Sequence, residues 1–317
     1  MEKKYDVTAL GELLIDFAVN GESEQGNQLF EACPGGAPCN VLAMLNKLGR
    51  KTAFIGKVGD DQFGKLLKDT ITNTGIEAKG LVMDKDIHTT LAFVHTFPDG
   101  DREFSFYRKP GADMLMEAKD VDAAWFQDAY ALHFCSVSLG EFPMKEAHRK
   151  AIDCARRAGC MISFDPNIRL PLWENPEALR NVIWEFAPMA HVLKISDEEL
   201  EFITGKADIK EALPRLFAGN TRLVIYTKGA DGAECYTERT SAYADGQKVK
   251  AVDTTGAGDG FIGAFLFCMA KDGVEVDQLA SLSREQLEKY LAFANKFCAK
   301  SITKYGAIAS YPTLTEM

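Results

Sequence analysis

Asp259 lies among closely spaced glycines in the stretch AVDTTGAGDGFIGAF, residues 251–265. Three of these glycines, Gly256, Gly258 and Gly260, favour a loop that binds phosphate, because a backbone without side chains can approach an anion closely. A carboxylate inside such a loop would repel phosphate. The stretch therefore predicts either that the loop binds no phosphate or that Asp259 takes part in the chemistry.

Two familiar phosphate-loop patterns nearly match the chain, and neither fits. GDDQFGKL, residues 59–66, has the spacing of a P-loop, but Leu66 stands where a magnesium-binding Ser or Thr is needed, and two aspartates would face the phosphates. GDGFIG, residues 258–263, matches the dinucleotide-binding pattern. It places Asp259 beside the pyrophosphate, however, and no predicted strand ends directly before it.

A third arrangement gives the acid a chemical role. If Gly256, Ala257 and Gly258 lead into a helix, free backbone N–H groups and the positive end of the helix dipole meet at one spot. Such an anion hole suits a phosphoryl group in transit, and Asp259 would face the attacking hydroxyl as general base. The alternative is that the small residues only allow close helix packing and that Asp259 complements the helix dipole.

The composition is that of a globular protein. The chain has 317 residues, of which 46% are hydrophobic and 26% charged, and its formal net charge is -10. This charge argues against a nucleic-acid or anionic-membrane partner, because either would need a basic face. Glu12 and Asp16 interrupt the N-terminal apolar stretch, so it does not resemble a signal peptide. Eight scattered cysteines predict reduced thiols in a cytoplasmic protein.

The elements that must position the glycine loop follow from the apolar pattern. Short runs rich in Val, Ile and Phe alternate with amphipathic stretches, which predicts an α/β fold with a mainly parallel central sheet flanked by helices. Residues 13–33 and 89–107 break this rhythm, the second range around a turn at Pro98–Asp101. They predict a small β-sheet lid over the ligand crevice, with exposed strands through which a homodimer forms.

The glycine loop has a second long motif as its companion. DTTGAGDGF, residues 253–261, and GGAPCNVLAMLNKLGRKTAFIGKVGDDQFG, residues 35–64, together resemble the two signatures of the ribokinase-like carbohydrate kinase family, in the family's order. The resemblance extends over essentially the whole chain. It implies a single domain over residues 1–317, built as a ribokinase-like three-layer sandwich with a β-sheet lid.

The resemblance also implies a sugar site between the main sheet and the lid. In the family an acid after the first strand and a Gly-Gly-Asn loop hold the sugar, and a carboxylate and an amide suit vicinal hydroxyls. Asn40 could instead cap a helix, the glycines could only form a turn, and either arginine could be a surface residue paired with a carboxylate. The implied sugar contacts are Asp16, Gly35, Gly36, Asn40, Arg108 and Asp259, with Arg169 near the path of the phosphoryl group.

The resemblance further implies a nucleotide site that binds ATP together with Mg²⁺. Ser196 replaces the family's asparagine, while Glu199 is retained and would hold magnesium through water; the two residues could equally form a capping box. The nucleotide contacts are Lys194, Glu199, Thr227, Gly229, Gly232, Gly256, Gly258 and Asn295. A K⁺ site like that of some relatives would use oxygens of Asp253, Thr255, Gly306 and Ser310.

These residues predict an ATP-dependent sugar kinase in which Asp259 is the base and Gly256, Ala257, Gly258 and Arg169 complete the catalytic group. The motifs are most similar to the fructokinase branch, which implies fructose as acceptor, phosphorylated at O6 or, as the lesser alternative, at O1. The nearest rival is a 2-keto-3-deoxygluconate kinase. A sugar-binding sensor without catalysis is a rival from another class, but a pure binder would not need the complete GAGD, and a dinucleotide oxidoreductase is the third rival.

Overall fold

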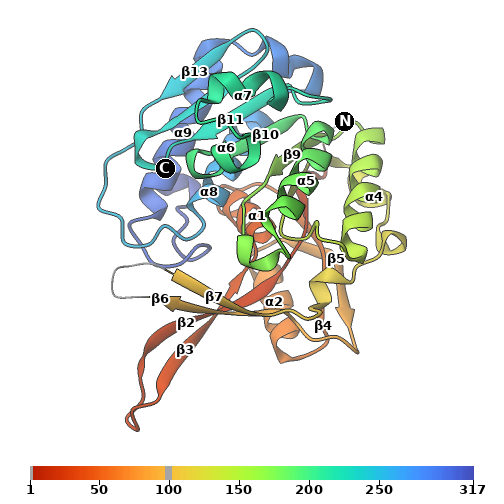
Figure 1. Cartoon of the computed structure of the whole chain (residues 1–317), viewed down its shortest axis with the longest axis vertical. Coiled ribbons are helices and arrows are strands. Elements are labelled where there is room, and N and C mark those ends of the chain that lie inside the picture. The colour runs from red at the N-terminus through yellow and green to blue at the C-terminus, as the bar shows by residue number, and fades with distance from the viewer. Residues whose placement is uncertain (1–2, 97–101) are drawn as a thin grey trace.

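The computed structural model describes residues 3–96 and 102–317. Its main sheet has nine strands in the order β13-β12-β11-β10-β9-β8-β1-β4-β5, of which β12 and β13 form an antiparallel edge and the others run parallel (Figure 1). The strands are β1 (Tyr5–Leu10), β4 (Thr52–Gly59), β5 (Glu77–Asp84), β8 (Ala129–Cys135), β9 (Met161–Asp165), β10 (Val192–Ser196), β11 (Leu223–Thr227), β12 (Ala233–Tyr236) and β13 (Ser241–Ala244).

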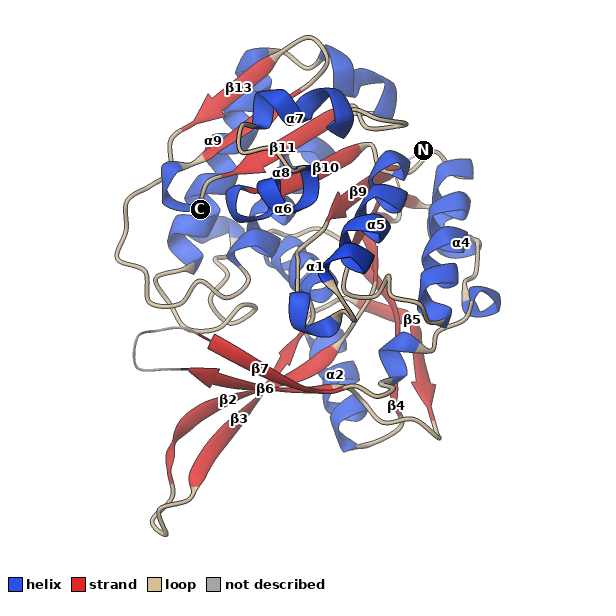
Figure 2. Ribbon diagram, viewed as in Figure 1, coloured by secondary structure: helices blue, strands red, loops and turns tan. Residues whose placement is uncertain are grey.

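Helices cover both faces of this sheet, and each face has its own apolar core (Figure 2). The first core contains α1 (Ala37–Lys47), α2 (Gln62–Asn73), α8 (Ala257–Asp272) and α9 (Arg284–Ser301). The second contains α3 (Ala124–Gln127), α4 (Pro143–Arg157), α5 (Pro176–Phe186), α6 (Asp197–Thr204) and α7 (Ile209–Leu216). No helix within the described ranges is long and apolar enough to cross a membrane.

Helix α8 is the element that carries the glycine loop into the core. It is buried continuously from Asp259 to Met269 and packs between α1 and α9. A helix enclosed on all sides must be apolar all round, which explains the run FIGAFLFCM after the acid. Burial fixes the helix in place and so fixes the direction in which its first turn points.

A second sheet projects from the main one, in the order β3-β2-β6-β7 (Figure 1). Its strands are β2 (Leu14–Glu22), β3 (Gln28–Gly35), β6 (Leu91–Thr96) and β7 (Arg102–Tyr107). They fall almost entirely within the two ranges that break the α/β rhythm. The prediction of a mainly parallel α/β fold with a small additional sheet is confirmed, whereas the turn predicted at Pro98–Asp101 lies outside the described residues.

The motif GDDQFGKL, residues 59–66, which has the spacing of a P-loop, holds the base of this projecting sheet. Asp61 caps α2 by accepting from the Gly64 amide at 2.8 Å. The same carboxylate accepts from the Thr89 amide at 2.9 Å and from the Thr89 hydroxyl at 2.8 Å, just before β6 begins. Asp61 therefore holds both a helix end and the base of a sheet, while the Asp60 carboxylate lies 3.7 Å from Lys65 Nζ on the surface.

Candidate active site

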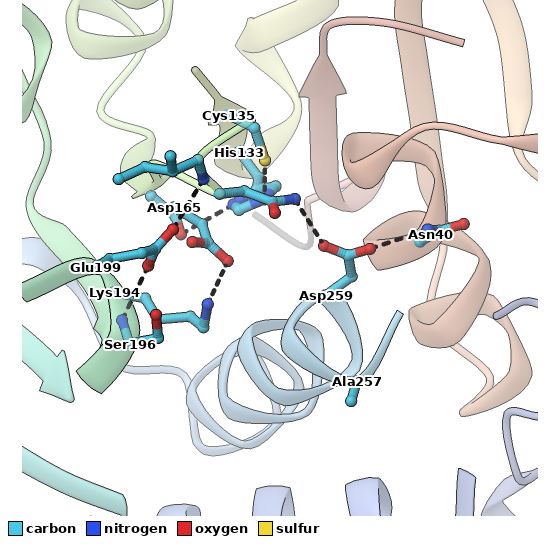
Figure 3. A network of polar contacts seen from close by, with 12 residues as sticks. Asn40, His133, Cys135, Asp165, Lys194, Ser196, Glu199, Ala257 and Asp259 are labelled. Carbon is cyan, nitrogen blue, oxygen red and sulfur yellow. Dashed lines mark hydrogen bonds and ion pairs between the residues drawn. The ribbon is translucent and has the colours of Figure 1, made fainter. Parts of the chain in front are cut away.

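Asp259 projects from the first turn of α8 toward two amide side chains. Gly256 precedes the helix with φ 73°, a left-handed conformation that glycine adopts without strain. The Asp259 carboxylate, 7% exposed, accepts from Asn40 Nδ2 at 2.9 Å (Figure 3) and from Asn167 Nδ2 at 3.3 Å. Each carboxylate oxygen thus has one donor, which fixes the orientation of the acid.

The surroundings of Asp259 tune its basicity. Burial raises the pKa of its carboxyl, because the charged form loses water, while the Asn40 hydrogen bond and the charges of Arg169 and Lys194 partly oppose this. A base with a raised pKa accepts a proton more readily near neutral pH. The carboxylate is therefore suited to remove a proton from a weakly acidic hydroxyl.

The start of α8 also presents free backbone donors. The Ala257 amide donates to the Thr254 carbonyl at 3.1 Å, so it is already engaged. The amides of Gly258 and Asp259, in contrast, donate to no group among the residues that the structure describes. Together with the helix dipole, these two N–H groups form a place that suits an anion.

The predicted acid and Gly-Gly loop of the sugar site lie in contact. A Cβ on Gly35 would come within 2.4 Å of Asp16 Oδ2, and a Cβ on Gly36 would come within 2.4 Å of the Glu12 carbonyl. Both positions therefore exclude a side chain, and Gly36 also has φ 123°. Burial raises the pKa of Asp16 to about 6, while Arg169 works against the shift.

The two predicted arginines have different environments. Arg108 is buried, and its Nε and Nη2 donate to Asp113 Oδ2 at 2.8 and 2.6 Å. The alternative to sugar binding was a surface arginine paired with a carboxylate. Arg108 does pair with a carboxylate, but the pair lies in the interior. Arg169 is exposed and donates from Nη1 to the Ile168 carbonyl at 2.8 Å, and its charge partly opposes the burial that raises the pKa values of Asp16 and Asp259.

Glu199 is held by two backbone amides. Its Oε2 accepts from the Ser196 amide and its Oε1 from the Ile168 amide, both at 2.9 Å. The capping arrangement with Ser196 is therefore present. Each carboxylate oxygen has a second lone pair, which fits a water of a hydrated Mg²⁺ better than direct coordination.

The predicted nucleotide contacts cluster at the carboxyl ends of β10 and β11. Thr227 ends β11, and Gly229 begins the short 3₁₀ helix that ends at Asp231. A Cβ on Gly232 would come within 2.2 Å of the Ala244 carbonyl. Asn295 of α9 donates from Nδ2 to this same carbonyl at 2.9 Å, and to that of Asp245 at 3.0 Å, so its amide nitrogen holds the chain after β13.

The loops of the predicted K⁺ site lie next to one another. Asp253 Oδ2 accepts from the Gly306 amide at 2.9 Å, and Asp253 Oδ1 accepts from the Thr255 amide at 2.9 Å. Ser310, which follows Gly306 closely in the sequence, is buried. The described residues contain no group of three His, Cys, Asp or Glu side chains that could hold a metal ion.

Sequence reasoning missed two site residues that stand beside Arg169 in the motif DPNIR. Asn167, with φ 46°, holds Asp259, and Asp165 accepts from Lys194 Nζ at 2.7 Å (Figure 3). A non-glycine residue with positive φ is uncommon, and asparagine is one of the residues that tolerates it. The strand-end position of DPN was the available signal, because ligands bind at the carboxyl ends of parallel strands.

A buried carboxylate, free helix amides and a lysine meet at the carboxyl edge of an α/β sheet, an arrangement that suits an enzyme of group transfer. The chain belongs to the pfkB family of carbohydrate kinases, which matches residues 4–314. The prediction of a ribokinase-like carbohydrate kinase is confirmed.

Individual relatives cover nearly the whole chain. A probable fructokinase-5 of Arabidopsis thaliana is 41% identical over 310 residues, 97% of this chain and 94% of the relative. The fructokinase of Xylella fastidiosa, solved with bound ATP, has a TM-score of 0.91 and 32% identity and covers 98% and 97% of the two chains. A double mutant of the fructokinase of Vibrio cholerae O395, solved with fructose, ADP and a potassium ion, has a TM-score of 0.87 and 31% identity, with coverage of 99% and 97%.

Proposed function

We infer that the chain is an ATP-dependent fructose kinase whose product is fructose 6-phosphate. The observation that carries this function is Asp259, buried and held by Asn40 and Asn167 directly beside the free amides of α8. The sequence similarity to fructokinases, with 41% identity to the Arabidopsis thaliana relative, supports the same acceptor. ATP is the donor, and the relative solved with bound ATP supports this.

The reaction follows from these positions. Asp259 takes the proton of the fructose hydroxyl as the hydroxyl oxygen attacks the γ-phosphorus. The bond between this phosphorus and the bridging oxygen breaks, and its electron pair goes to ADP. The amides of Gly258 and Asp259 stabilise the negative charge on the transferring group, which is the main requirement of phosphoryl transfer.

Substrates are held on two sides of this centre. Asp16 and Asn40 would bind sugar hydroxyls, and Asn40 Oδ1, which is buried without a hydrogen bond among the described residues, would gain one there. Thr227, Gly229 and Gly232 would follow the nucleotide. Glu199 would hold hydrated Mg²⁺, which supplies charge neutralisation to the phosphates when bound.

The projecting sheet would serve as a lid. It carries Asp16 into the sugar site on β2, so its closure would exclude water and limit ATP hydrolysis. Its other face would form a homodimer, and Asp253, Thr255, Gly306 and Ser310 would supply oxygens to K⁺. A cytoplasmic location is proposed as well, because the eight cysteines are free thiols.

A sugar panel tests the function. The protein is incubated with ATP, Mg²⁺ and each of several sugars, including fructose and 2-keto-3-deoxygluconate, and the phosphorylated position is assigned by NMR. Fructose should give the highest kcat/KM, with phosphate on O6. A kcat/KM at least tenfold higher for 2-keto-3-deoxygluconate would overturn the acceptor while leaving the family and the base in place.

A further inference from the structure

Tyr311 packs against the turn that begins α8, and the reaction described above gives it no part. It belongs to the segment that follows α9, and it is 2% exposed. The Tyr311 hydroxyl donates to the Gly256 carbonyl at 2.8 Å. Gly256 directly precedes α8 and lies two positions before Gly258, the first residue with a free amide. The buried hydroxyl therefore contacts the backbone that leads to the free amides.

The fit between this tyrosine and the first turn of α8 is close. A Cβ on Gly256 would come within 2.5 Å of the Tyr311 hydroxyl oxygen and within 2.6 Å of Ala307 Cβ. A Cβ on Gly260 would lie 3.4 Å from Tyr311 Cε1 and 3.0 Å from Phe297 Cε1. The two rings contact each other, with centroids 5.5 Å apart. The turn thus rests on two aromatic rings, and a side chain at position 256 would push them away.

The glycines of the turn explain why its backbone needs support. A glycine can adopt many backbone angles, so Gly256 and Gly258 do not fix the direction of the neighbouring peptide groups by themselves. The Gly256 carbonyl accepts from the Gly260 amide at 2.8 Å within the helix. The Tyr311 hydroxyl is a second donor to this carbonyl. Two donors from different directions hold the peptide group between Gly256 and the helix in one orientation.

The supporting tyrosine is itself held by α1. Lys47, in the last turn of α1, donates from Nζ to the Ile308 carbonyl at 2.6 Å and to the Tyr311 carbonyl at 3.1 Å. The same helix carries Asn40, which donates to Asp259 at 2.9 Å (Figure 3). Helix α1 therefore holds the first turn of α8 in two ways, directly through the acid and indirectly through the tyrosine.

The tyrosine hydroxyl keeps its proton in this position. Burial raises the pKa of Tyr311, and the nearby charge of Asp259 raises it further. A protonated phenol donates one hydrogen bond, and the Gly256 carbonyl receives it. The hydroxyl therefore supports the turn at every pH at which the protein is assayed.

We propose that Tyr311 is a positioning residue for phosphoryl transfer, whose hydroxyl fixes the Gly256 peptide group and thereby the direction of the two free amides. The inference rests on the proposed kinase function and names the residue that prepares its anion site. Donors that already point to the place where charge develops need no reorganisation during the reaction. Loss of the hydroxyl should therefore weaken the binding of the transition state more than the binding of the substrates.

A pair of conservative variants tests this role. Tyr311→Phe removes the hydroxyl but keeps the ring, and the Gly256 carbonyl retains the Gly260 amide as donor. Tyr290→Phe is the matched control. Tyr290 is also buried, and its hydroxyl donates at 2.9 Å to Asp272, the last residue of α8. The two variants thus each remove one buried hydroxyl, at opposite ends of the same helix.

The measurements are kcat, KM for ATP and fructose, and the affinity for ADP with and without aluminium fluoride in the presence of Mg²⁺ and fructose. Aluminium fluoride mimics the phosphoryl group in transit, so the affinity that it adds reports the binding of the transition state. For Tyr311→Phe we expect kcat and this added affinity to fall roughly tenfold, less than the roughly 10²–10³-fold effect of removing a whole donor. Both KM values and the affinity for ADP alone should change less than about threefold. Tyr290→Phe should match the parent in kcat and in the added affinity.

The alternative is that the bond only satisfies a buried hydroxyl, which predicts parent-like transfer in both variants. A folded Tyr311→Phe protein with parent-like kcat and added affinity would therefore overturn the role of Tyr311 and leave the kinase intact. Equal losses in the two variants would overturn it as well, because they would reflect a general loosening of α8. A parent protein that phosphorylates no sugar and gains no affinity from aluminium fluoride would overturn the proposed kinase function, and the role of Tyr311 with it.

Discussion

Asn40 donates a hydrogen bond of 2.9 Å to Asp259, which lies 219 positions further along the chain. The bond joins α1, which follows the Gly-Gly loop, to the first turn of α8. It therefore connects the two long motifs of the sequence in one contact. The residue that we propose binds the sugar and the residue that we propose removes its proton are thus fixed relative to each other.

The substitution Asp259→Asn tests the general base. Asparagine keeps the size and position of the side chain but cannot accept the proton, so kcat should fall by roughly 10²–10⁴, or about 3–5 kcal/mol of barrier. Sugar and ATP should still bind. If Asp259 only complemented the helix dipole, the change would instead cost a few tenths to about 1 kcal/mol of stability.

Steady-state kinetics and calorimetric binding distinguish these outcomes. A folded Asp259→Asn protein that binds both substrates and turns over within about fivefold of the parent would contradict the base assignment, because that loss is far below the effect expected. The raised pKa of Asp259 adds a pH test: kcat should decline with acidity from a pH above the ordinary aspartate range, and the decline should disappear in the variant.

Local sequence patterns predict much of the fold and also the position of the proposed base, Asp259. The apolar rhythm predicts the strands β1 and β4 and the helices α1 and α2, and the GAGD glycines predict the direction of Asp259, because a helix start fixes where its first turn points. The pair of Lys194 and Asp165 was beyond such reasoning. It depends on β9 and β10 being neighbours in the sheet, which no local pattern specifies.

Contacts between residues that are close in sequence were also hard to predict where the backbone between the two residues is irregular. Arg108 and Asp113 are only five residues apart, yet a loop and a short 3₁₀ helix bring them together in the interior. The Ala257 amide belongs to the predicted anion hole but donates to Thr254. Sequence indicates which residue types gather at a site, whereas these partners are set by turns of one or two residues.

The buried Glu12 makes stability depend on pH. Its Oε1 accepts from the Ala37 amide and its Oε2 from the Ser138 hydroxyl, both at 3.1 Å, and burial raises its pKa to about 7. The folded-state pKa thus exceeds the ordinary value of 4.5. Below pH 4.5 the Glu12 carboxyl is protonated in both states, so it does not lower the free energy of unfolding. Between pH 4.5 and about pH 7 the unfolded state ionises first, and the free energy of unfolding falls progressively, by about 3 kcal/mol at most above pH 7.

Glu12→Gln should remove this dependence, because the amide can serve both partners and carries no charge. Urea unfolding at pH 5 and pH 8 should show the variant gaining roughly 2–3 kcal/mol on the parent between the two pH values. Glu234→Gln is the control: the pKa of Glu234 is lowered, against burial, by Lys228 and Tyr236, so its difference from the parent should stay constant. A constant difference for Glu12→Gln as well would refute the assignment.

K⁺ should raise activity over Na⁺ and over tetramethylammonium. Asp253 ties the loop before α8 to Gly306, and a cation coordinated there would stabilise the backbone that leads to the free amides of Gly258 and Asp259. The larger K⁺ suits a site of carbonyl and hydroxyl oxygens, so we expect a rate increase of several-fold in K⁺ at matched ionic strength. Equal rates in the three salts would remove the cation site from the description.

The last prediction concerns the face of the projecting sheet that points away from Asp16. Side chains alternate along a strand, so Phe17 lies opposite to Asp16 in direction, and it stacks on Phe93 with ring centroids 4.8 Å apart. Phe30 and Tyr107 contact the ring of Phe93 from two sides, both with centroids at 5.4 Å. Tyr107 is 67% exposed and Phe30 36% exposed, so these two rings of the aromatic face are open to solvent, whereas Phe17 also packs against Phe63 of α2.

Such a face is typical of a surface that another protein covers, and a second copy of the sheet would bury it in a homodimer. Phe30→Glu and Tyr107→Glu should each weaken the dimer by roughly 10–100-fold, since each loses a buried aromatic contact of about 1.5–3 kcal/mol. Sedimentation velocity over a range of concentrations measures this, with Val249→Glu as control, because Val249 is comparably exposed outside the sheet. A parent that stays monomeric, or a dimer that neither substitution weakens, would show that the aromatic face has another partner or none.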